Sequence, residues 1–515
     1  MGPTGQRGVH DAVVVGGGHN GLVAATLLAR GGRSVLVLER RQEAGGAAVN
    51  SPAFPGVAAR LSRYAYLVSL LPATLIRTLG LRVELRPRAA ASYSPCGDTG
   101  LLVTRHDEET RESMTRLTGD QRAHEAWQGF RSLLERVAER LFPTLTEPLR
   151  SREEMRRLLD DEEAWRALFE EPLSAVLERT FASDLVRGLV CTDAMIGTFA
   201  AAADPLLRQN RCFLYHVIGN GTGRWDIPVG GMGALSDALA TAARRAGAHI
   251  HTGAEVVELA TDGRLAEVTC ADGQRFRARH VLANVAPTVL GSLLDEKPSS
   301  ERPEGSALKV NMVLSRLPRL RDPLVSPELA FAGTFHVNEG YGQLQRAYEE
   351  ASALRIPTEA PCELYCHSLS DPSVLSAPLR AAGAHTLTIF GLHMPARLFR
   401  DNPDQAKREA VAATIRAVNS ALAEPLEECL WRDADGRPCL EALTPPDLEA
   451  ELGLPGGHIF HRDLTWPYAE REDEVGGWGV ETAHDNVWIC GAGARRGGGV
   501  SGIPGHNAAR AVLEA

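Results

Sequence analysis

Six residues near the N-terminus, Gly16-Gly-Gly-His-Asn-Gly21, constrain the fold of this chain more than any other segment. They follow a short apolar run, Asp11–Val15, which is suited to a buried strand, and they precede Leu22–Arg30, which has the composition of a helix. A second apolar run, residues 34–38, ends at Glu39. Strand, glycine turn, helix and strand within about 30 residues form a βαβ unit, and a glycine turn at this place in such a unit predicts dinucleotide binding.

Each glycine of this turn has an expected role. Gly16 permits the tight turn, Gly18 lets the backbone approach a pyrophosphate, and Gly21 lets the helix pack closely on the strand. The free N–H groups at the start of the helix favour phosphate. A carboxylate at Glu39 can accept hydrogen bonds from the adenosine ribose. The alternative is a glycine turn that serves packing only.

Two further glycine segments favour a flavin over a nicotinamide. The pair Gly45-Gly46 follows the second strand, where flavoproteins with two dinucleotide folds bring backbone close to the ribityl chain and ring of FAD. A second cluster, residues 491–502, lies between a predicted strand at Asn486–Cys490 and a predicted helix at Asn507–Leu513. A helix that begins there directs its positive end toward the flavin. We therefore predict FAD as the cofactor. The alternative is a pair of unrelated glycine turns.

Several segments resemble the phytoene desaturase-related FAD-dependent oxidoreductases. The matching segments spread over nearly the whole chain and are Asp11–Ala48, Leu61–Leu71, Trp225–Ser236, Ala307–Pro318, Leu454–Phe460 and Asn486–Ala509. The C-terminal pattern GxGxxxGGGVxGxxGxNAA is the most specific of them. One departure is Ala494-Arg-Arg496, where the family often has Ala-His-Pro.

The resemblance implies an α/β and α+β fold: a Rossmann-type FAD-binding domain assembled from separated segments, with an inserted mixed-sheet substrate domain and a helical cap. Residues 105–171 are highly charged with helical spacing, which is typical of such a cap. The expected division is an FAD-binding domain of residues 1–85, 220–300 and 461–515, a helical cap or substrate region of residues 86–219 and a substrate-binding domain of residues 301–460.

The resemblance also implies an activity. The expected reaction is dehydrogenation, or desaturation, of an apolar, isoprenoid-like or polyene-like substrate by hydride transfer to flavin N5, with reoxidation by oxygen or a quinone. A redox-neutral flavin-dependent isomerase and an amine or amino-acid oxidase are alternatives within enzymes. An FAD-containing binding or assembly protein with little turnover is the alternative from another class.

The motifs and the resemblance together predict the FAD contacts. These are Gly16, Gly18, His19, Asn20, Gly21, Glu39, Arg40, Gly45, Gly46, Ala47, Val256, Gly491, Gly499, Val500 and Ser501. The sequence does not single out a catalytic acid or base. His336, His393 and Arg495 are polar candidates that could reach a substrate, and the two histidines follow apolar runs of the predicted substrate domain.

No metal site is predicted. His249 and His251 would share one face of a predicted strand, but no third ligand accompanies them. Cys362 and Cys366 lack the spacing of a C-x-x-C redox pair.

Composition limits the partners. Acidic residues outnumber basic ones by 65 to 55, so the net charge of −10 argues against nucleic-acid binding. Nine scattered cysteines are typical of a reducing cytoplasm, and richness in arginine and alanine suggests a bacterial gene. No apolar run is long enough for a transmembrane helix. Residues 61–81 have apolar side chains at roughly helical spacing, and we expect either core packing or a peripheral membrane contact there.

Overall fold

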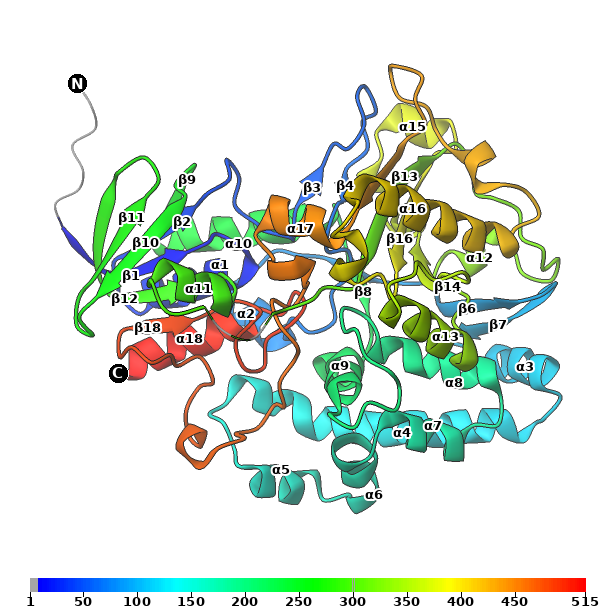
Figure 1. The fold of residues 1–515 in the computed structure, drawn as a ribbon, viewed down its shortest axis with the longest axis horizontal. Coiled ribbons are helices and arrows are strands. Elements are labelled where there is room, and N and C mark those ends of the chain that lie inside the picture. Colours follow the sequence, from blue (N-terminus) through cyan, green and yellow to red (C-terminus); the bar gives the residue numbers. More distant parts are fainter. Residues whose placement is uncertain (1–7, 299, 301) are drawn as a thin grey trace.

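Two large β-sheets and a layer of helices organise the protein. The computed structural model describes residues 8–298, 300 and 302–515. In Figure 1 the first sheet lies beside the helices of both chain ends, the second sheet lies at the opposite end of the molecule, and helices α3 to α9 form a layer along one side of the second sheet. The chain passes back and forth among these three parts.

The first sheet is built around β1 (Val9–Val15). This strand pairs in parallel with β2 (Val35–Glu39) and with β12 (Arg275–Ala283). β2 continues to β9 (His249–Thr252), and β18 (Val487–Ile489) joins β12. The parallel strands of this sheet therefore come from all three chain segments predicted for the FAD-binding domain.

Two antiparallel strands extend the first sheet beyond β12. They are β10 (Val256–Thr261) and β11 (Ala266–Cys270). The turns between β10 and β11 and between β11 and β12 fall at 261–264 and 271–274, where Asp-Gly pairs predict hairpins.

Three helices cover one face of the first sheet: α1 (His19–Arg30), α10 (Met232–Ala246) and α18 (Ile503–Glu514). Helices α1 and α18 cross closely, since a Cβ atom on Gly505 would lie 2.0 Å from the carbonyl oxygen of Asn20. The last helix of the chain is therefore packed against the first. Two shorter helices of this region are α2 (Ala73–Leu79) and α11 (Pro287–Leu293).

The second sheet has the order β17-β13-β16-β15-β14-β6-β7. The bounds of its strands are β6 (Ala90–Cys96), β7 (Thr99–Thr104), β13 (Leu308–Leu314), β14 (Thr334–Val337), β15 (Cys362–Tyr365), β16 (His385–Gly391) and β17 (Leu440–Leu443). The helices between and beyond these strands are α12 (Pro327–Ala330), α13 (Tyr341–Ser352), α14 (His367–Ser370), α15 (Ala377–Ala381), α16 (Pro403–Ser420) and α17 (Pro445–Leu452).

The first part of the predicted cap or substrate region is not helical, because residues 90–104 form the β6–β7 hairpin. β6 pairs in parallel with β14, so residues 90–104 belong to the second sheet. The reason is local, because residues 100–104 form a continuous buried run that suits a strand between two covered faces.

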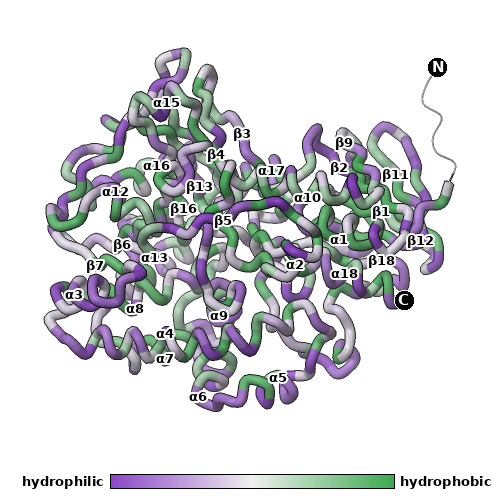
Figure 2. Tube along the Cα trace, turned by 180° about the vertical axis from the view of Figure 1, so that it is seen from behind, coloured by the Kyte–Doolittle hydropathy of each residue, from purple (hydrophilic) through white to green (hydrophobic). Residues whose placement is uncertain are grey.

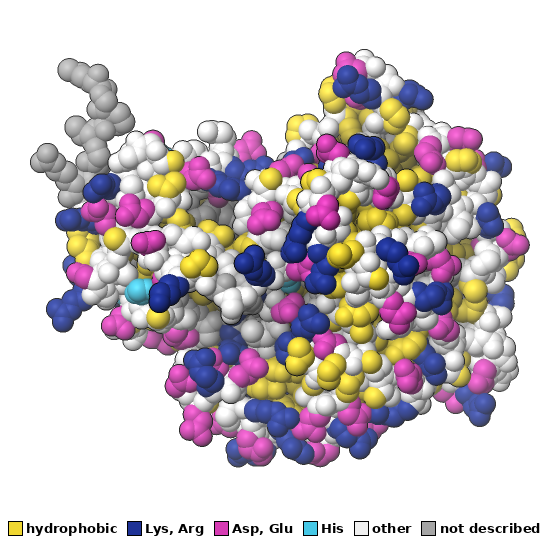
Figure 3. Space-filling view, in the orientation of Figure 1, with side chains coloured by type: hydrophobic (Ala, Val, Ile, Leu, Met, Phe, Trp, Pro, Cys, Tyr) yellow, Lys and Arg dark blue, Asp and Glu magenta, His cyan; other side chains and the backbone are white. Residues whose placement is uncertain are grey.

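The cap itself is helical, as expected from its charge pattern. Its helices are α3 (Asp107–Thr118), α4 (Arg122–Leu141), α5 (Arg152–Leu159), α6 (Glu162–Trp165), α7 (Leu173–Thr180), α8 (Asp184–Cys191) and α9 (Arg208–Val217). Figure 2 shows polar and apolar residues alternating along α4 and α7. Charged side chains of both signs cover the outer surface of the cap in Figure 3. Phe130, Trp165 and Phe213 are buried inside the cap.

The helix expected over residues 61–81 is largely wrong. Only Ala73–Leu79 is helical, and the preceding residues form the short strand β4 (Leu61–Ser62), which pairs with β3 (Asn50–Ser51), followed by irregular backbone. Leu67, Leu70 and Leu71 are buried in the protein core. Core packing therefore accounts for their spacing. No helix in the described part of the chain is long and apolar enough to cross a membrane.

Candidate active site

A cavity of about 660 Å³ lies where the two sheets and the cap meet. Its wall includes Gly18 and Glu39 from the first sheet region, His336 from the second sheet, and Trp127 and Phe213 from the cap. All three parts of the fold are therefore needed to form it.

Glu39 lies at one end of this cavity with its carboxylate held by backbone. Gly17 N donates to Oε2 at 2.7 Å, and Arg41 N donates to Oε1 at 2.8 Å. The side chain is buried, with 5% of its surface exposed. These contacts fix an acidic group at the end of β2, next to the glycine turn, which is the geometry that suits recognition of ribose hydroxyls.

A cradle of bare backbone lies beside Glu39. Gly45 N donates to Gly17 O at 2.9 Å, which brings the two glycine turns together. A Cβ atom on Gly46 would lie 3.1 Å from the Cα atom of Gly18, and Gly46 has a φ of +59°. Side chains therefore do not fit between these turns, and the backbone is left free to approach a phosphate or ribityl group.

Asn284 supports this cradle and was not predicted from the sequence. It follows β12, and its Nδ2 atom donates to Gly16 O at 3.0 Å. A Cβ atom on Gly18 would lie 3.0 Å from the same Nδ2 atom. The available signal was its place directly after a buried strand of the parallel sheet, at the carboxyl edge where ligands bind.

Two neutral histidines mark the next part of the wall. Burial lowers the pKa of His19 to about 4. Burial likewise lowers the pKa of His461 to about 4. His19 Nε2 and His461 Nδ1 are buried without a hydrogen-bond partner. Such orphaned polar atoms, together with the backbone cradle, fit a large bound group with polar edges.

Most of the predicted FAD contacts lie on the cavity wall. These are Gly16, Gly18, His19, Asn20, Glu39, Arg40, Gly46, Ala47, Val256, Gly499 and Val500. The remaining four, Gly21, Gly45, Gly491 and Ser501, are not among its lining residues. Gly21 serves packing, because a Cβ atom there would lie 2.4 Å from Gly16 O.

Of the three catalytic candidates, only His336 lines the cavity. His393 is buried elsewhere, against the rings of Phe199 and Tyr348. Arg495 forms ion pairs with two glutamates of the loop before β18, at 2.7 and 2.8 Å. The structure therefore places His393 and Arg495 away from the site, contrary to expectation, because His393 packs among aromatic rings and Arg495 is held in ion pairs.

Lys309 and Tyr66 form a further part of the wall that sequence reasoning missed. Lys309 Nζ donates to Tyr64 O at 2.8 Å and lies 3.8 Å from the centroid of the Tyr66 ring. Burial holds the pKa of Lys309 well below its usual value. The available signal was a single charged residue within the fully buried strand β13, whose other residues are apolar except Asn311.

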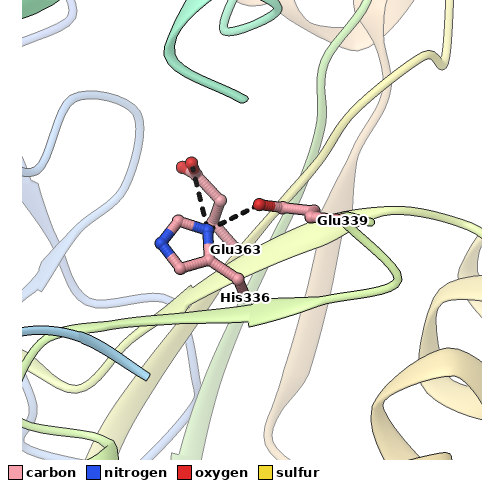
Figure 4. Close-up of side chains that lie close together, drawn as sticks. All are labelled: His336, Glu339 and Glu363. Atoms are coloured by element: carbon pink, nitrogen blue, oxygen red, sulfur yellow. Dashed lines mark hydrogen bonds and ion pairs between the residues drawn. The ribbon is translucent and has the colours of Figure 1, made fainter. Parts of the chain in front are cut away.

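A polar cluster forms another side of the cavity (Figure 4). His336 Nδ1 lies 2.5 Å from Glu339 Oε2 and 3.8 Å from Glu363 Oε1. Burial raises the pKa of Glu363 to about 8 and that of nearby Asp193 to about 6. Tyr365 donates its hydroxyl to Glu363. The remaining wall is mainly apolar, with Leu67, Val103, Trp127, Phe130, Leu134, Leu189, Phe213, Trp225, Phe390 and Ile459.

Similarity to known proteins decides what this architecture is. Residues 73–361 match the family described as flavin containing amine oxidoreductase, and residues 14–72 match the NAD(P)-binding Rossmann-like domain. The first match spans more than half of the chain. The protein belongs to the flavin-containing amine oxidoreductase family. It is an FAD-dependent oxidoreductase, and the backbone cradle, Glu39 and the two orphaned histidines are the residues that would hold the FAD.

Members of this family from distant organisms are similar along the whole chain. An uncharacterized protein of Mycobacterium tuberculosis is 50% identical and covers 98% of this chain and 97% of its own length. Pyridine nucleotide-disulfide oxidoreductase domain-containing protein 2 of Mus musculus is 30% identical over 98% of this chain and 93% of its own. Among solved structures, cyclohexylamine oxidase from Brevibacterium oxydans shares the fold, with a TM-score of 0.57, 17% identity and coverage of 98% and 99%.

Proposed function

We propose that this oxidoreductase dehydrogenates a small, mostly apolar molecule of isoprenoid type. The observation that supports the proposal is the single cavity that joins the backbone cradle for FAD to the apolar wall formed by the cap and the second sheet. Burial of apolar surface is the main favourable term available to such a wall, at about 25 cal/mol per Å². A hydrocarbon substrate would gain most from it.

The chain contributes binding, orientation and exclusion of water. Bound FAD supplies the hydride acceptor, and hydride loss from a carbon atom depends on orientation and desolvation more than on a nucleophile. Trp127, Phe130 and Phe213 line the cavity on the cap side, where their apolar rings favour the exclusion of water. The Tyr66 ring lies beside that of Tyr365, with centroids 4.6 Å apart and ring planes tilted by 44°, and the two rings form an aromatic wall for an extended substrate.

An amine substrate is the second candidate. The observation that favours it is the presence of two carboxyl groups, on Asp193 and Glu363, in the cavity wall. A substrate ammonium would form charge-assisted hydrogen bonds with them. The apolar wall area exceeds this polar part, which is why the hydrocarbon substrate is the first candidate.

Anaerobic reduction of the bound flavin tests the two candidates against each other. The FAD-loaded protein is mixed with a ten-carbon acyclic isoprenoid hydrocarbon or with an alkylamine of the same carbon number, and flavin absorbance is followed at high substrate concentration. We expect the hydrocarbon to bleach the flavin. Bleaching by the amine alone would replace the proposal with the second candidate. Admission of oxygen, or of a quinone under anaerobic conditions, then identifies the electron acceptor.

A pair of variants connects the result to the cavity. Phe130→Asn places an amide in the apolar wall and should raise the KM for the hydrocarbon with little change in FAD content. Phe335→Leu, in the buried face of the second sheet outside the cavity wall, is the control for a change in packing.

A further inference from the structure

Three buried side chains meet on the second sheet at a place fixed by strand pairing. β14 and β15 are antiparallel, and their register sets His336 directly opposite Glu363. Such cross-strand neighbours have Cβ atoms about 5 Å apart. Glu339 follows β14 after a turn and reaches back to the same imidazole (Figure 4). One nitrogen and one oxygen from each carboxylate all lie within 4.8 Å of one another.

The charges around this cluster do not balance within the protein. The carboxyl groups of Asp193, Glu339 and Glu363 influence one another, and Arg88 is the cation that acts on Asp193 and Glu363. The Arg88 guanidinium donates its hydrogen bonds elsewhere, to Thr334 Oγ1 and to the carbonyl oxygen of Trp225. Burial holds the pKa of all three carboxyl groups above the usual range, and once they lose their protons the set carries an excess of two negative charges.

One carboxylate oxygen of the cluster has no hydrogen-bond partner. Glu339 is 97% buried, and its Oε1 atom has no hydrogen bond while Oε2 contacts His336. Figure 4 shows the Glu339 carboxylate directed at the imidazole and the Glu363 carboxylate approaching the same nitrogen from another side. A buried carboxylate oxygen without a partner is costly unless a cation or a proton satisfies it.

We propose that His336, Glu339 and Glu363 bind one divalent transition-metal ion of the Zn²⁺ and Mn²⁺ class. An imidazole with carboxylates suits these ions better than Mg²⁺, which prefers an all-oxygen shell. Two positive charges match the excess negative charge of the cluster. Ligand atoms about 2.1 Å from a tetrahedral ion lie roughly 3.4 Å apart, so His336 and Glu339 would separate slightly and the ion would replace the proton that they share.

The ion would have an open position toward the substrate. His336 and Glu363 both line the cavity, whereas Glu339 lies behind them. With three protein ligands, the fourth position would take a water molecule or an oxygen donor of the substrate, such as a hydroxyl or carbonyl group. This last step rests on the proposed function; the binding of the ion rests on the cluster alone.

Metal titration of the FAD-loaded protein tests the site without a known substrate. After removal of metals by a chelator and exhaustive dialysis, Zn²⁺ and Mn²⁺ are titrated in a calorimeter and bound metal is counted by mass spectrometry. We expect one Zn²⁺ per chain, with affinity reduced at least tenfold in Glu363→Gln and in Glu339→Gln. Asp322→Asn changes a buried carboxylate of the same domain that binds Tyr93 OH at 2.9 Å, and it should leave the affinity unchanged.

Two outcomes would overturn the proposal: no binding of either ion to the unmodified protein, or binding that both glutamine variants leave unaltered. In the first case the cluster holds protons in place of a metal. If the variants do not fold, anomalous scattering at the zinc edge from Zn²⁺-soaked crystals of the unmodified protein decides the question. A peak bounded by the three side chains supports the site, and its absence there contradicts it. Neither result alters the flavin-reduction test of the proposed function.

Discussion

Glu39 Oε2 accepts the backbone N–H of Gly17 at 2.7 Å, so the acidic residue that ends the second strand is bound directly to the glycine turn that follows the first. The two parts of the dinucleotide motif therefore act as one unit. Any change at Glu39 alters both the ribose contact expected for FAD and the position of the glycine turn.

Glu39→Ala should weaken FAD retention substantially. Hydrogen bonds to a charged group contribute about 1.5–3 kcal/mol each, so loss of one or two of them corresponds to at least a tenfold rise in the Kd of FAD. The measurement is fluorescence titration of the apoprotein with FAD. Glu267→Ala removes exposed ion pairs from β11 of the same sheet and is the matched control. Equal FAD affinity in the two variants would disprove the role of Glu39.

Gly499→Val separates backbone strain from cofactor contact. Gly499 has a φ of +55° and lines the cavity, whereas Gly273 has a φ of +82° in an open hairpin turn with no heavy atom within 4 Å of an added Cβ atom. Valine is strained at both positions, by about 1–3 kcal/mol. We expect both variants to lower Tm, and only the Gly499 variant to lower the flavin-to-protein absorbance ratio. Full FAD content in Gly499→Val would mean that the C-terminal glycine cluster is a packing turn.

Arg496→Ala should destabilise the fold far more than Arg495→Ala. Arg496 is 1% exposed and donates to the carbonyl oxygens of Thr144, Glu147 and Trp478, which ties the cap to the C-terminal segment. Its loss leaves buried acceptors unsatisfied, at about 1–3 kcal/mol each. Arg495 makes ion pairs with partly exposed partners, for which about 1 kcal/mol is expected. Urea unfolding of the two variants at constant FAD measures the difference, and similar midpoints would refute it.

The buried neutral histidines should destabilise the protein between about pH 6.5 and pH 4. Burial lowers the pKa from 6.5 to about 4 for His19, His216, His393 and His461. Below pH 6.5 these histidines become protonated in the unfolded chain but stay neutral in the folded protein. Their contribution to the free energy of unfolding therefore decreases as the pH decreases. Because His393 lies outside the cavity, His393→Asn isolates the effect: its Tm should fall less than that of the unmodified protein between pH 7 and pH 5. An identical fall in both proteins would exclude His393 from this dependence.

The sequence predicted the cofactor end of the site better than the substrate end. Gly16, Gly18 and Glu39 lie within one short βαβ unit and depend on its backbone geometry. Their spacing in the sequence is therefore enough to predict their role. Asn284 and Lys309 reach the cavity only through sheet pairing across long stretches of chain, which local patterns do not reveal. The predicted His336 gained its partners in the same way, since the register of β14 and β15 sets Glu363 beside it.

The misassigned segments have a common physical cause. Residues 61–72 carry apolar side chains at near-helical spacing, but irregular backbone buries them equally well when neighbouring elements surround it. The β6–β7 hairpin was grouped with the charged helices that follow it, in one cap or substrate region. Its true partner, β14, is more than two hundred residues away in the chain.

The close crossing of α1 and α18 sets the order of events during synthesis. A ribosome releases β1 and α1 early, but the helix that packs over them is the last element of the chain. Until α18 has emerged, the face of α1 that meets it stays uncovered and the Gly499 side of the cofactor site is missing. We therefore expect FAD to be captured only once the segment that forms α18 has been synthesised.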